Sequence, residues 1–325
     1  MDFTCSTHHQ LLESLISAGY KFITFENYIT HQERPERFVI LRHDVEARYK
    51  NALDLAIIQH NLNIKGSYYF RFLPAHFDTE IIRKIAVLGH EIGYHYEDLS
   101  YCHGNYEKAL ERFAKNLAIL REIAPVKTIC MEGAPLSKWD NRDLWRKEKS
   151  AVGSRQSIVK GQNPEPGTWN HQDNKSSHPS PLTAHYNDFG IIGEPYFDID
   201  FNNVFYLTDT GRRWDGEKVS VRDKVGSRQS AVGSRQSAVN DKNSKITPNS
   251  ITPTQNSKLN NSNSRLRFHS TFDIITAANN RRLPDQIMFT FHPQRWTVKP
   301  LPWMKELVMQ NVKNVVKRVV LSLKS

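Results

Sequence analysis

Two histidines and three carboxylates lie within the short stretch Gly89–Asp98, which reads Gly-His-Glu-Ile-Gly-Tyr-His-Tyr-Glu-Asp. Imidazole and carboxylate side chains bind divalent cations such as zinc, and the same groups transfer protons during hydrolysis. A solvated polar loop, in which the histidines bond backbone carbonyls, is the alternative interpretation. The stretch therefore indicates either a metal-dependent hydrolytic site or an ordinary polar loop.

Two further polar clusters stand at the ends of apolar runs. The cluster Arg42–Glu46 follows the run Phe38–Leu41, and the cluster Phe291–Trp296 ends a run that begins at Gln286. Because the carboxyl ends of parallel strands open on one face of an α/β barrel, residues far apart in sequence converge there. We therefore expect both clusters to meet the histidines of Gly89–Asp98 at one site.

Four residues of these clusters are expected to carry the chemistry: Asp44, Glu46, His95 and His292. A carboxylate and a histidine from different strands suit a divalent metal that keeps an open position for water. A further carboxylate can accept the proton of that water, and a further histidine can protonate the leaving group. The constellation predicts metal-assisted hydrolysis of an amide or an ester. His90, in contrast, is expected to bond a backbone carbonyl.

Alternating helical and strand-like segments predict an α/β fold with a parallel sheet, most simply a barrel. Apolar periodicity predicts helices at His9–Ala18, Ala47–His60, Thr79–Leu88, Tyr106–Ile123, Ser270–Asn279 and Leu301–Leu323. Short apolar runs predict strands at Phe38–Leu41, Gly66–Phe72, Glu91–His95, Val126–Met131, Phe189–Ile192, Tyr196–Ile199, Val204–Leu207 and Gln286–Phe291. Tyr20–Tyr28 is predicted to be a connecting stretch. The whole chain, residues 1–325, is expected to form a single barrel domain.

Two low-complexity segments, residues 150–185 and 224–267, interrupt this domain. The unit Ser-Ala-Val-Gly-Ser-Arg-Gln-Ser at 150–157 returns twice, nearly unchanged, across 225–239. A unit so small and polar cannot build a core, so both segments are predicted to be disordered insertions. They hold three basic against two acidic residues and eight against one, and so supply most of the net charge of +10. Since they lack interleaved aromatics for base stacking, no nucleic-acid partner is expected.

The remaining composition favours a cytoplasmic protein. Cys5, Cys102 and Cys130 are irregularly spaced, which is typical of reduced thiols. The first residues are acidic and lack the apolar run of a signal peptide, and no stretch of about 18 apolar residues predicts an integral membrane segment. The predicted helix Leu301–Leu323 is basic on one side, so it is expected either to cover the barrel core or to lie at a membrane surface.

At its polar clusters the chain resembles the polysaccharide deacetylase family (carbohydrate esterase family four), whose members have a distorted barrel of about seven parallel strands. Gly89–His95 resembles the second motif of that family, in which the last histidine binds the metal. Arg42–Glu46 is similar to the first motif, whose paired acids supply the catalytic base and a metal ligand. Phe291-His292 resembles the late motif that provides a general-acid histidine. The resemblance covers most of Phe38–Trp296 outside the insertions.

The resemblance implies a divalent metal, zinc above all, held by Glu46 and His95, with Asp44 and His292 as catalytic residues. Because Val45 separates two acids that are adjacent in the family, either acid could be the base. Leu99 stands where the family has a second metal histidine, and the nearby candidates for a third ligand are Glu97, Asp98 and His103. The arginine of a third motif is also missing where Gly133–Pro135 aligns with it.

Residues suited to sugar binding lie near the end of the chain. Aromatic faces and planar cations suit hydroxylated ligands, so Asp209, Arg213, Trp214 and Trp296 are predicted to contact the substrate. An ordinary turn around Gly211 is the alternative for the first three.

The sequence thus predicts a metal-dependent hydrolase that removes an acetyl group from an acetylated sugar or polysaccharide precursor. A cytoplasmic location favours a nucleotide- or lipid-linked precursor over a finished polymer. The alternative is a carbohydrate-binding barrel without catalytic activity that has lost its complete metal site, and Leu99 and the missing arginine favour it.

Overall fold

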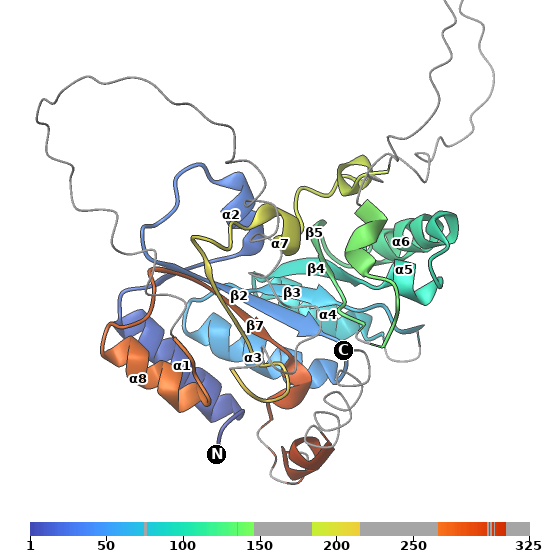
Figure 1. Cartoon of the computed structure of the whole chain (residues 1–325). Coiled ribbons are helices and arrows are strands. Elements are labelled where there is room, and N and C mark those ends of the chain that lie inside the picture. Colours follow the sequence, from blue (N-terminus) through green and yellow to red (C-terminus); the bar gives the residue numbers. More distant parts are fainter. Residues whose placement is uncertain are drawn as a thin grey trace, which may run out of the picture.

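The computed structural model describes residues 1–74, 77–134, 136–145, 184–214, 266–297, 299, 301 and 303–309. In this part of the chain a seven-stranded parallel sheet runs in the order β5-β4-β3-β2-β7-β6, with β1 beside β2 (Figure 1). The strands are β1 (Lys21–Ile23), β2 (Phe38–Val45), β3 (Ser67–Phe70), β4 (Glu91–Tyr96), β5 (Val126–Met131), β6 (Phe205–Thr208) and β7 (Gln286–Phe291). The predicted α/β class with a parallel sheet is confirmed.

Strand β2 is the centre of the sheet and pairs with three other strands. Along one edge it pairs with β7, from Phe38 opposite Gln286 to His43 opposite Phe291. The other edge is divided, because β1 pairs with residues 38–40 and β3 pairs with residues 42–45. All eight residues of β2 are buried, as the continuous apolar run Phe38–Leu41 predicts.

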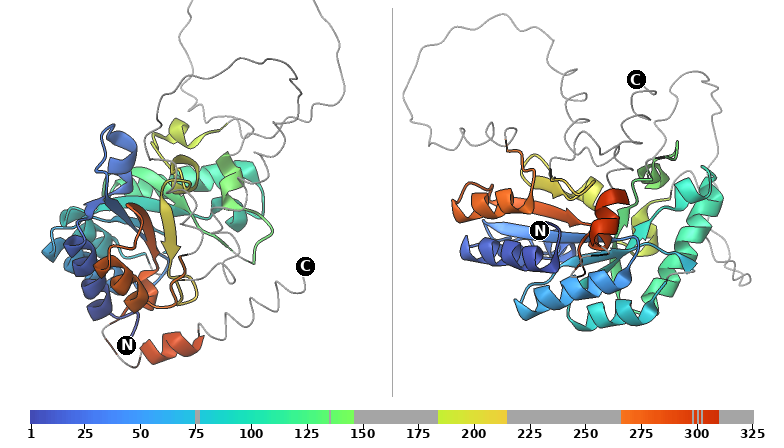
Figure 2. Two further views of the ribbon diagram at one scale, coloured as in Figure 1. Left: turned by 60° about the vertical axis from the view of Figure 1, so that its left-hand side comes forward. Right: turned by 90° about the horizontal axis from the view of Figure 1, so that it is seen from below.

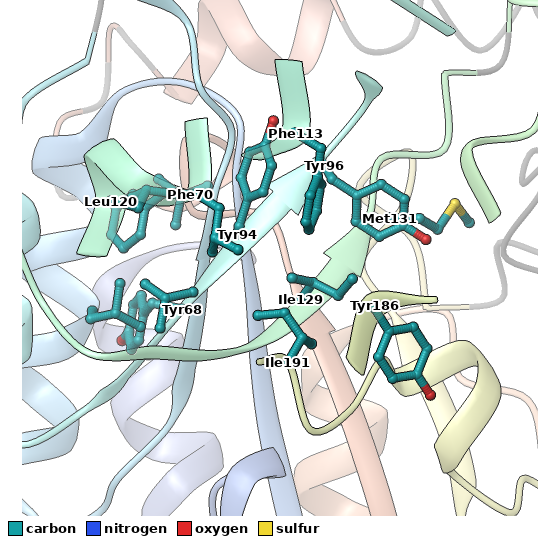
Figure 3. Close-up of a cluster of buried hydrophobic side chains, with 14 of the residues drawn as sticks. Tyr68, Phe70, Tyr94, Tyr96, Phe113, Leu120, Ile129, Met131, Tyr186 and Ile191 are labelled. Carbon is teal, nitrogen blue, oxygen red and sulfur yellow. The ribbon is translucent and has the colours of Figure 1, made fainter. Parts of the chain in front are cut away.

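Five helices cover one face of the sheet, as the two further views show (Figure 2). They are α1 (Cys5–Ser17), α3 (Tyr49–Asn61), α4 (Thr79–Val87), α6 (Tyr106–Arg121) and α8 (Thr271–Asn279). Tyr68, Phe70, Tyr94 and Tyr96 of β3 and β4 pack on this side with Phe113 of α6 (Figure 3). The aromatic side chains that alternate along these strands therefore fix which face carries the helices.

The opposite face of the sheet changes from apolar to polar along the strand direction. At the start of the strands Phe38, Ile40 and Met288 pack with Phe25 and Tyr28 of the short helix α2 (Phe25–Thr30). Further along, Arg42 lies beside Thr290 on β7 and beside Ser67 on β3. Polar side chains are thus collected toward the carboxyl ends of the strands, where the sequence predicts the chemistry.

Most predicted elements occur within a few residues of their expected bounds, and the errors have local causes. Tyr196–Ile199 is not a strand, because Pro195 begins the helical turn α7 (Pro195–Asp198) and the Glu194 side chain accepts from the Tyr196 amide. The strand predicted at Phe189–Ile192 does not form, because Phe189 ends a 3-10 helix, η3 (Tyr186–Phe189). The following residue, Gly193, makes only a single bridge with Thr128. The predicted connection Tyr20–Tyr28 contains β1 and most of α2.

The remaining short elements are α5 (Asp98–Tyr101), η2 (Asn141–Trp145) and η7 (Pro293–Arg295). The predicted insertions 150–185 and 224–267 lie almost wholly outside the described residues, as does the second half of the predicted helix Leu301–Leu323. Cys5, Cys102 and Cys130 form no disulfide with one another. Within the described ranges, no helix combines the length and apolar character needed to cross a bilayer.

Candidate active site

Strand β2 ends in a buried ion pair between Arg42 and Asp44. Because these residues are two apart on one strand, both side chains point to the same face. The Arg42 guanidinium donates from Nε to Asp44 Oδ1 at 2.8 Å and from Nη2 to Asp44 Oδ2 at 2.7 Å. Burial alone would raise the pKa of Asp44, but the paired guanidinium outweighs it and lowers the pKa below its usual value. Asp44 is therefore an ionised carboxylate in a fixed orientation.

Strand β4 brings His95 to this pair. The His95 ring is held through Nδ1, which lies 3.0 Å from the backbone oxygen of Cys130 on β5 and donates to it in the matching tautomer. Its Nε2 then points toward two carboxylates, Glu132 Oε2 at 3.1 Å and Asp44 Oδ2 at 4.0 Å. A histidine anchored in this way through one nitrogen presents the other to a metal or a charged partner.

Gly93 makes room for this arrangement between Glu91 and His95 on the same face of β4. A Cβ atom at Gly93 would lie 2.3 Å from Cδ1 of Tyr69 and 3.0 Å from the Thr128 backbone oxygen. The Tyr69 ring therefore occupies the space of a missing side chain beneath the site. The Gly-His-Glu-Ile-Gly-Tyr-His motif thus has a packing requirement at Gly93 in addition to its polar residues.

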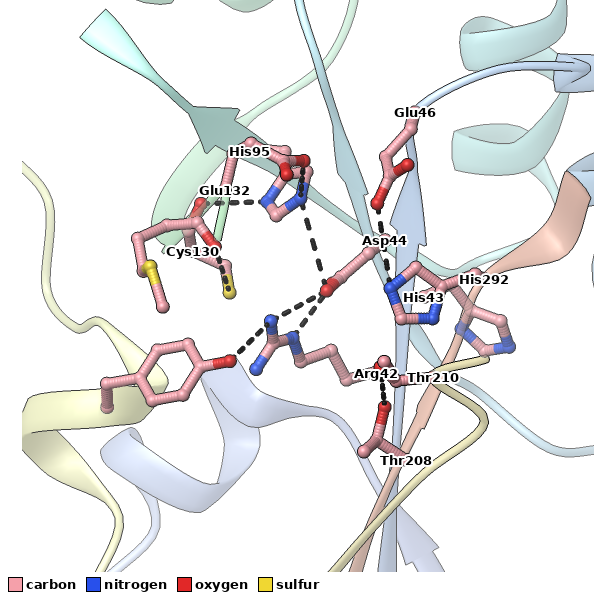
Figure 4. Close-up of polar contacts among 12 residues, drawn as sticks. Arg42, His43, Asp44, Glu46, His95, Cys130, Glu132, Thr208, Thr210 and His292 are labelled. Carbon is pink, nitrogen blue, oxygen red and sulfur yellow. Dashed lines mark hydrogen bonds and ion pairs between the residues drawn. The ribbon is translucent and has the colours of Figure 1, made fainter. Parts of the chain in front are cut away.

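Glu132, which follows β5, supplies a carboxylate that the sequence analysis did not assign to the site. Its Oε2 atom is buried and faces His95 Nε2 at 3.1 Å. Ligand atoms of Glu46, His95 and Glu132 lie within 4.8 Å of one another, and so do those of Asp44, His95 and Cys130 (Figure 4). The described residues therefore include two groups that could hold a metal ion: Asp44, His95 and Cys130 are all buried, whereas Glu46 and Glu132 are partly exposed beside the buried His95.

The charges of Glu46, His95 and Glu132 favour a cation between these three side chains. Burial and the neighbouring Glu132 carboxylate raise the pKa of Glu46. Burial opposes ionisation of Glu132, but His95 outweighs it and lowers the pKa of Glu132 to about 2. Burial would lower the pKa of His95, yet Asp44 and Glu132 raise it to about 9. A proton on His95 thus occupies the place that a divalent cation can take, and the donor set of two carboxylates and one imidazole fits such a cation.

His292 reaches the site from the opposite side, after β7. Its Nδ1 lies 2.5 Å from Asp209 Oδ1, and its backbone N–H donates to Asp209 Oδ2 at 3.0 Å. Asp209 also accepts from Arg295 Nη1 at 2.6 Å and from Trp296 Nε1 at 2.7 Å. Burial would raise the pKa of Asp209, but His292 and Arg295 outweigh it and lower the pKa to about 2. Asp209 is therefore a fixed anion that orients the His292 ring.

Glu46 links the two halves of the site. Its Oε1 atom lies 3.6 Å from His292 Nε2, and its Oε2 atom accepts from Gln294 Nε2 at 3.0 Å. Since Nδ1 of His292 faces Asp209, the other ring nitrogen faces Glu46 and the metal-ligand candidates (Figure 4). The four residues predicted from strand ends, Asp44, Glu46, His95 and His292, are thus brought together.

The residues considered near Leu99 do not take part in this group. Leu99 itself is fully buried in the hydrophobic core beneath the helices. Asp98 accepts from Tyr94 and Arg112 on the helix side of the sheet, and Glu97 forms an ion pair with Arg71. His103 packs against Trp139. None of these four supplies a ligand atom to the candidate metal groups found among the described residues.

The predicted substrate contacts fit the structure poorly, except for Arg213, which is exposed. Trp214 is only 4% exposed; its ring packs with Phe3, Phe289 and Phe291, so no face is open to a sugar. Trp296 is fully buried and donates to Asp209. Both tryptophans are therefore core residues that support the site from behind.

His90 has the backbone role that the sequence predicts. Its Nε2 lies 3.0 Å from the Ala56 backbone oxygen, and its Nδ1 accepts from the Gly66 amide at 3.1 Å. The ring therefore joins the start of β4 to α3 and to the residue that precedes β3. It lies away from the cluster around His95.

Comparisons of the chain with family models, with curated proteins and with solved structures found no match.

Proposed function

We propose that this protein is a metal-dependent hydrolase that removes an acetyl group from an acetylated sugar. The observation that carries the proposal is the meeting of His95, Glu46 and Glu132 with an Asp209–His292 pair at the carboxyl ends of parallel strands. We also propose that the sheet is a distorted barrel. The bridge between Gly193 and Thr128 extends it beyond β5, and only residues 194–204 then separate this edge from β6.

In this proposal Glu46, His95 and Glu132 hold the metal, and zinc suits a set of one imidazole and two carboxylates. Asp44 is left as the base, because Arg42 already balances its charge whereas Glu46 and Glu132 crowd each other. A bound divalent cation would polarise the acyl carbonyl and acidify a water molecule.

The protein side chains then account for the proton transfers. The Asp44 carboxylate accepts a proton from the attacking water, and Arg42 holds its two oxygens in place during this step. Protonated His292 donates through Nε2 to the departing sugar nitrogen or oxygen, so that acetate and the free sugar are released. Asp209 stabilises the positive charge on His292 before that donation.

Leu99 and the missing arginine, which favoured a carbohydrate-binding protein without activity, argue less strongly for it in this arrangement. Leu99 cannot supply a ligand, but Glu132 offers a third donor beside His95. The arginine missing after β5 has a counterpart in Arg42, which reaches Asp44 from its own strand. A cytoplasmic location, expected from the sequence, would suit a nucleotide- or lipid-linked acetylated sugar.

Metal content tests the proposal first. We expect about one zinc per chain by elemental mass spectrometry after reconstitution, and at least tenfold weaker binding in His95→Ala and Glu132→Ala. His31→Ala, which changes an exposed histidine, is the matched control and should bind normally. Acetate release from a panel of N- and O-acetylated sugars then tests the reaction. A folded protein that takes up no divalent metal would contradict the hydrolase proposal.

A further inference from the structure

A short helical stretch near the end of the described chain carries its apolar side chains outward. Residues 303–309 are helical and lie at the outside of the molecule, away from the sheet (Figure 1). Leu301, Met304, Val308 and Met309 are 47–74% exposed, so this stretch holds four of the fourteen large exposed apolar side chains of the described residues. Positions 301, 304, 305 and 308 share one face of a helix.

The opposite face attaches this stretch to the body of the protein. Trp303 donates from Nε1 to the backbone oxygen of Asp2 at 2.7 Å, and the Arg212 guanidinium lies 4.8 Å from the centre of its ring. Glu306 pairs with Arg48 at 3.4 Å. The predicted role of covering the barrel core therefore does not apply to residues 301–309, because their apolar stripe faces away from it.

Basic side chains surround the apolar stripe. A groove of about 900 Å³ separates it from α3 and is lined by Arg48, Lys50, Lys299 and Lys305, with Asp54 as its acidic residue. Lys50 pairs with Asp54, and Arg48 pairs with Glu306. Among the described residues, no carboxylate forms an ion pair with Lys299 or Lys305. Ile57, Ile58 and Leu301 give the same groove an apolar lining.

The sequence beyond this stretch continues both features. Apolar residues recur at helical spacing at Val312, Val315, Val316, Val319 and Leu323, which lie outside the described residues. Basic residues follow at Lys313, Lys317, Arg318 and Lys324, and no acidic residue occurs after Glu306. Exposed apolar side chains flanked by lysines are the combination that inserts into the boundary between headgroups and acyl chains of an anionic bilayer.

We propose that this face is a docking surface for an anionic lipid bilayer. Leu301, Met304 and Val308 enter the outer part of the bilayer, while Lys299 and Lys305 contact the phosphates of the headgroups. The helix lies along the membrane surface and does not cross it. This proposal does not depend on the metal site, so either proposal can fail without the other.

Vesicle sedimentation with the full chain tests this surface. We expect binding to vesicles of phosphatidylcholine with phosphatidylglycerol, weak binding to phosphatidylcholine alone, and release as salt is raised. Met304→Glu with Val308→Glu should weaken binding to anionic vesicles roughly tenfold or more, and so should Lys299→Glu with Lys305→Glu. Val87→Glu is the matched control, because Val87 is 81% exposed at the end of α4; it should leave vesicle binding unchanged.

Three results would overturn the proposal. One is a full chain that does not sediment with anionic vesicles, and a second is binding that both double variants retain. The third is a dimer, seen by light scattering without lipid, in a protein that does not bind vesicles. If Met304→Glu with Val308→Glu dissociates that dimer, a second copy of the chain occupies this face. Thermal melting of each variant shows that a lost interaction is not lost folding.

Discussion

Arg42 holds both oxygens of Asp44 at 2.8 and 2.7 Å, inside a site where each side chain is almost completely buried. A buried ion pair of this kind stabilises little by itself, since desolvation offsets most of the attraction. Removing one partner is costly, because it leaves an uncompensated charge in the protein interior.

Replacing Arg42 should therefore destabilise the protein strongly. Arg42→Met should lower the free energy of unfolding by about 3–5 kcal/mol in urea titrations, and Arg42→Met with Asp44→Leu should recover much of that loss. Lys50→Met, which removes an exposed ion pair with Asp54, is the control and should change stability by less than about 1 kcal/mol. A double variant as unstable as the single one would show that the pair does not act as a unit.

Asp44 and Glu46 should separate into different roles. Asp44→Asn keeps the shape of the side chain but removes the proton acceptor, so we expect zinc to be retained and acetate release to fall by roughly 100-fold or more. Glu46→Gln should instead weaken zinc binding by about tenfold or more. Metal content and acetate release, measured on both variants, distinguish the roles. If Asp44→Asn lost zinc and Glu46→Gln kept it, Asp44 would be the metal ligand and Glu46 the base.

Asp209 should act only through His292. Asp209→Asn removes the charge that orients the ring, so acetate release should fall by roughly 100-fold while zinc content stays at the wild-type level. Asp285→Asn, a change at an exposed carboxylate, serves as the control. Acetate release at the wild-type rate by a folded Asp209→Asn variant would contradict the role of Asp209.

Gly93 should not tolerate a methyl group. Gly93→Ala places a Cβ atom 2.3 Å from the Tyr69 ring, and we expect a loss of about 1–3 kcal/mol from the displaced packing. Gly133→Ala is matched to it, because a Cβ atom at Gly133 would meet nothing within 4 Å. Urea titrations of both variants measure the difference. Equal stability of the two variants would mean that Tyr69 moves at little cost.

His90 should make stability depend on pH between neutrality and weak acid. Burial lowers its pKa from 6.5 to about 4. Because the unfolded chain then binds the proton more tightly, this histidine contributes stability that is lost as the pH falls from about 6.5 to about 4, at about 1.4 kcal/mol per pH unit. His90→Asn keeps an acceptor near Nδ1 but does not titrate. In urea titrations, the stability advantage of the wild type over this variant should therefore shrink from pH 7 to pH 4.5.

The strand-end argument predicted which residues meet, because it depends only on the order and direction of strands. Asp44, Glu46, His95 and His292 follow runs long and apolar enough to be recognised as buried strands. The same argument could have found Glu132, since it directly follows β5, the neighbour of the strand that carries His95. The resemblance instead implies a third ligand near position 99, and Glu132 lies far from that position in the sequence.

The tryptophans were mispredicted because residue type does not reveal the direction of a side chain in a loop. Trp214 and Trp296 lie among polar residues in the sequence, yet Phe3 at the start of the chain packs against both rings. This contact joins distant parts of the chain, and no local pattern encodes it. The two-nitrogen geometry of the Arg42–Asp44 pair likewise depends on the rotamers of both side chains, which the sequence does not specify.

The pairing of β2 with β7 has a consequence for how the protein is made. Phe38 lies opposite Gln286, so almost the entire chain must be synthesised before this ladder can form. Closing so large a loop costs entropy before any contact of the ladder compensates it, which is typical of slow folding. His292 follows β7 directly, so this proposed general acid reaches Glu46 only when β7 has docked. A nascent chain that ends before β7 would carry the proposed metal ligands without the proposed proton donor.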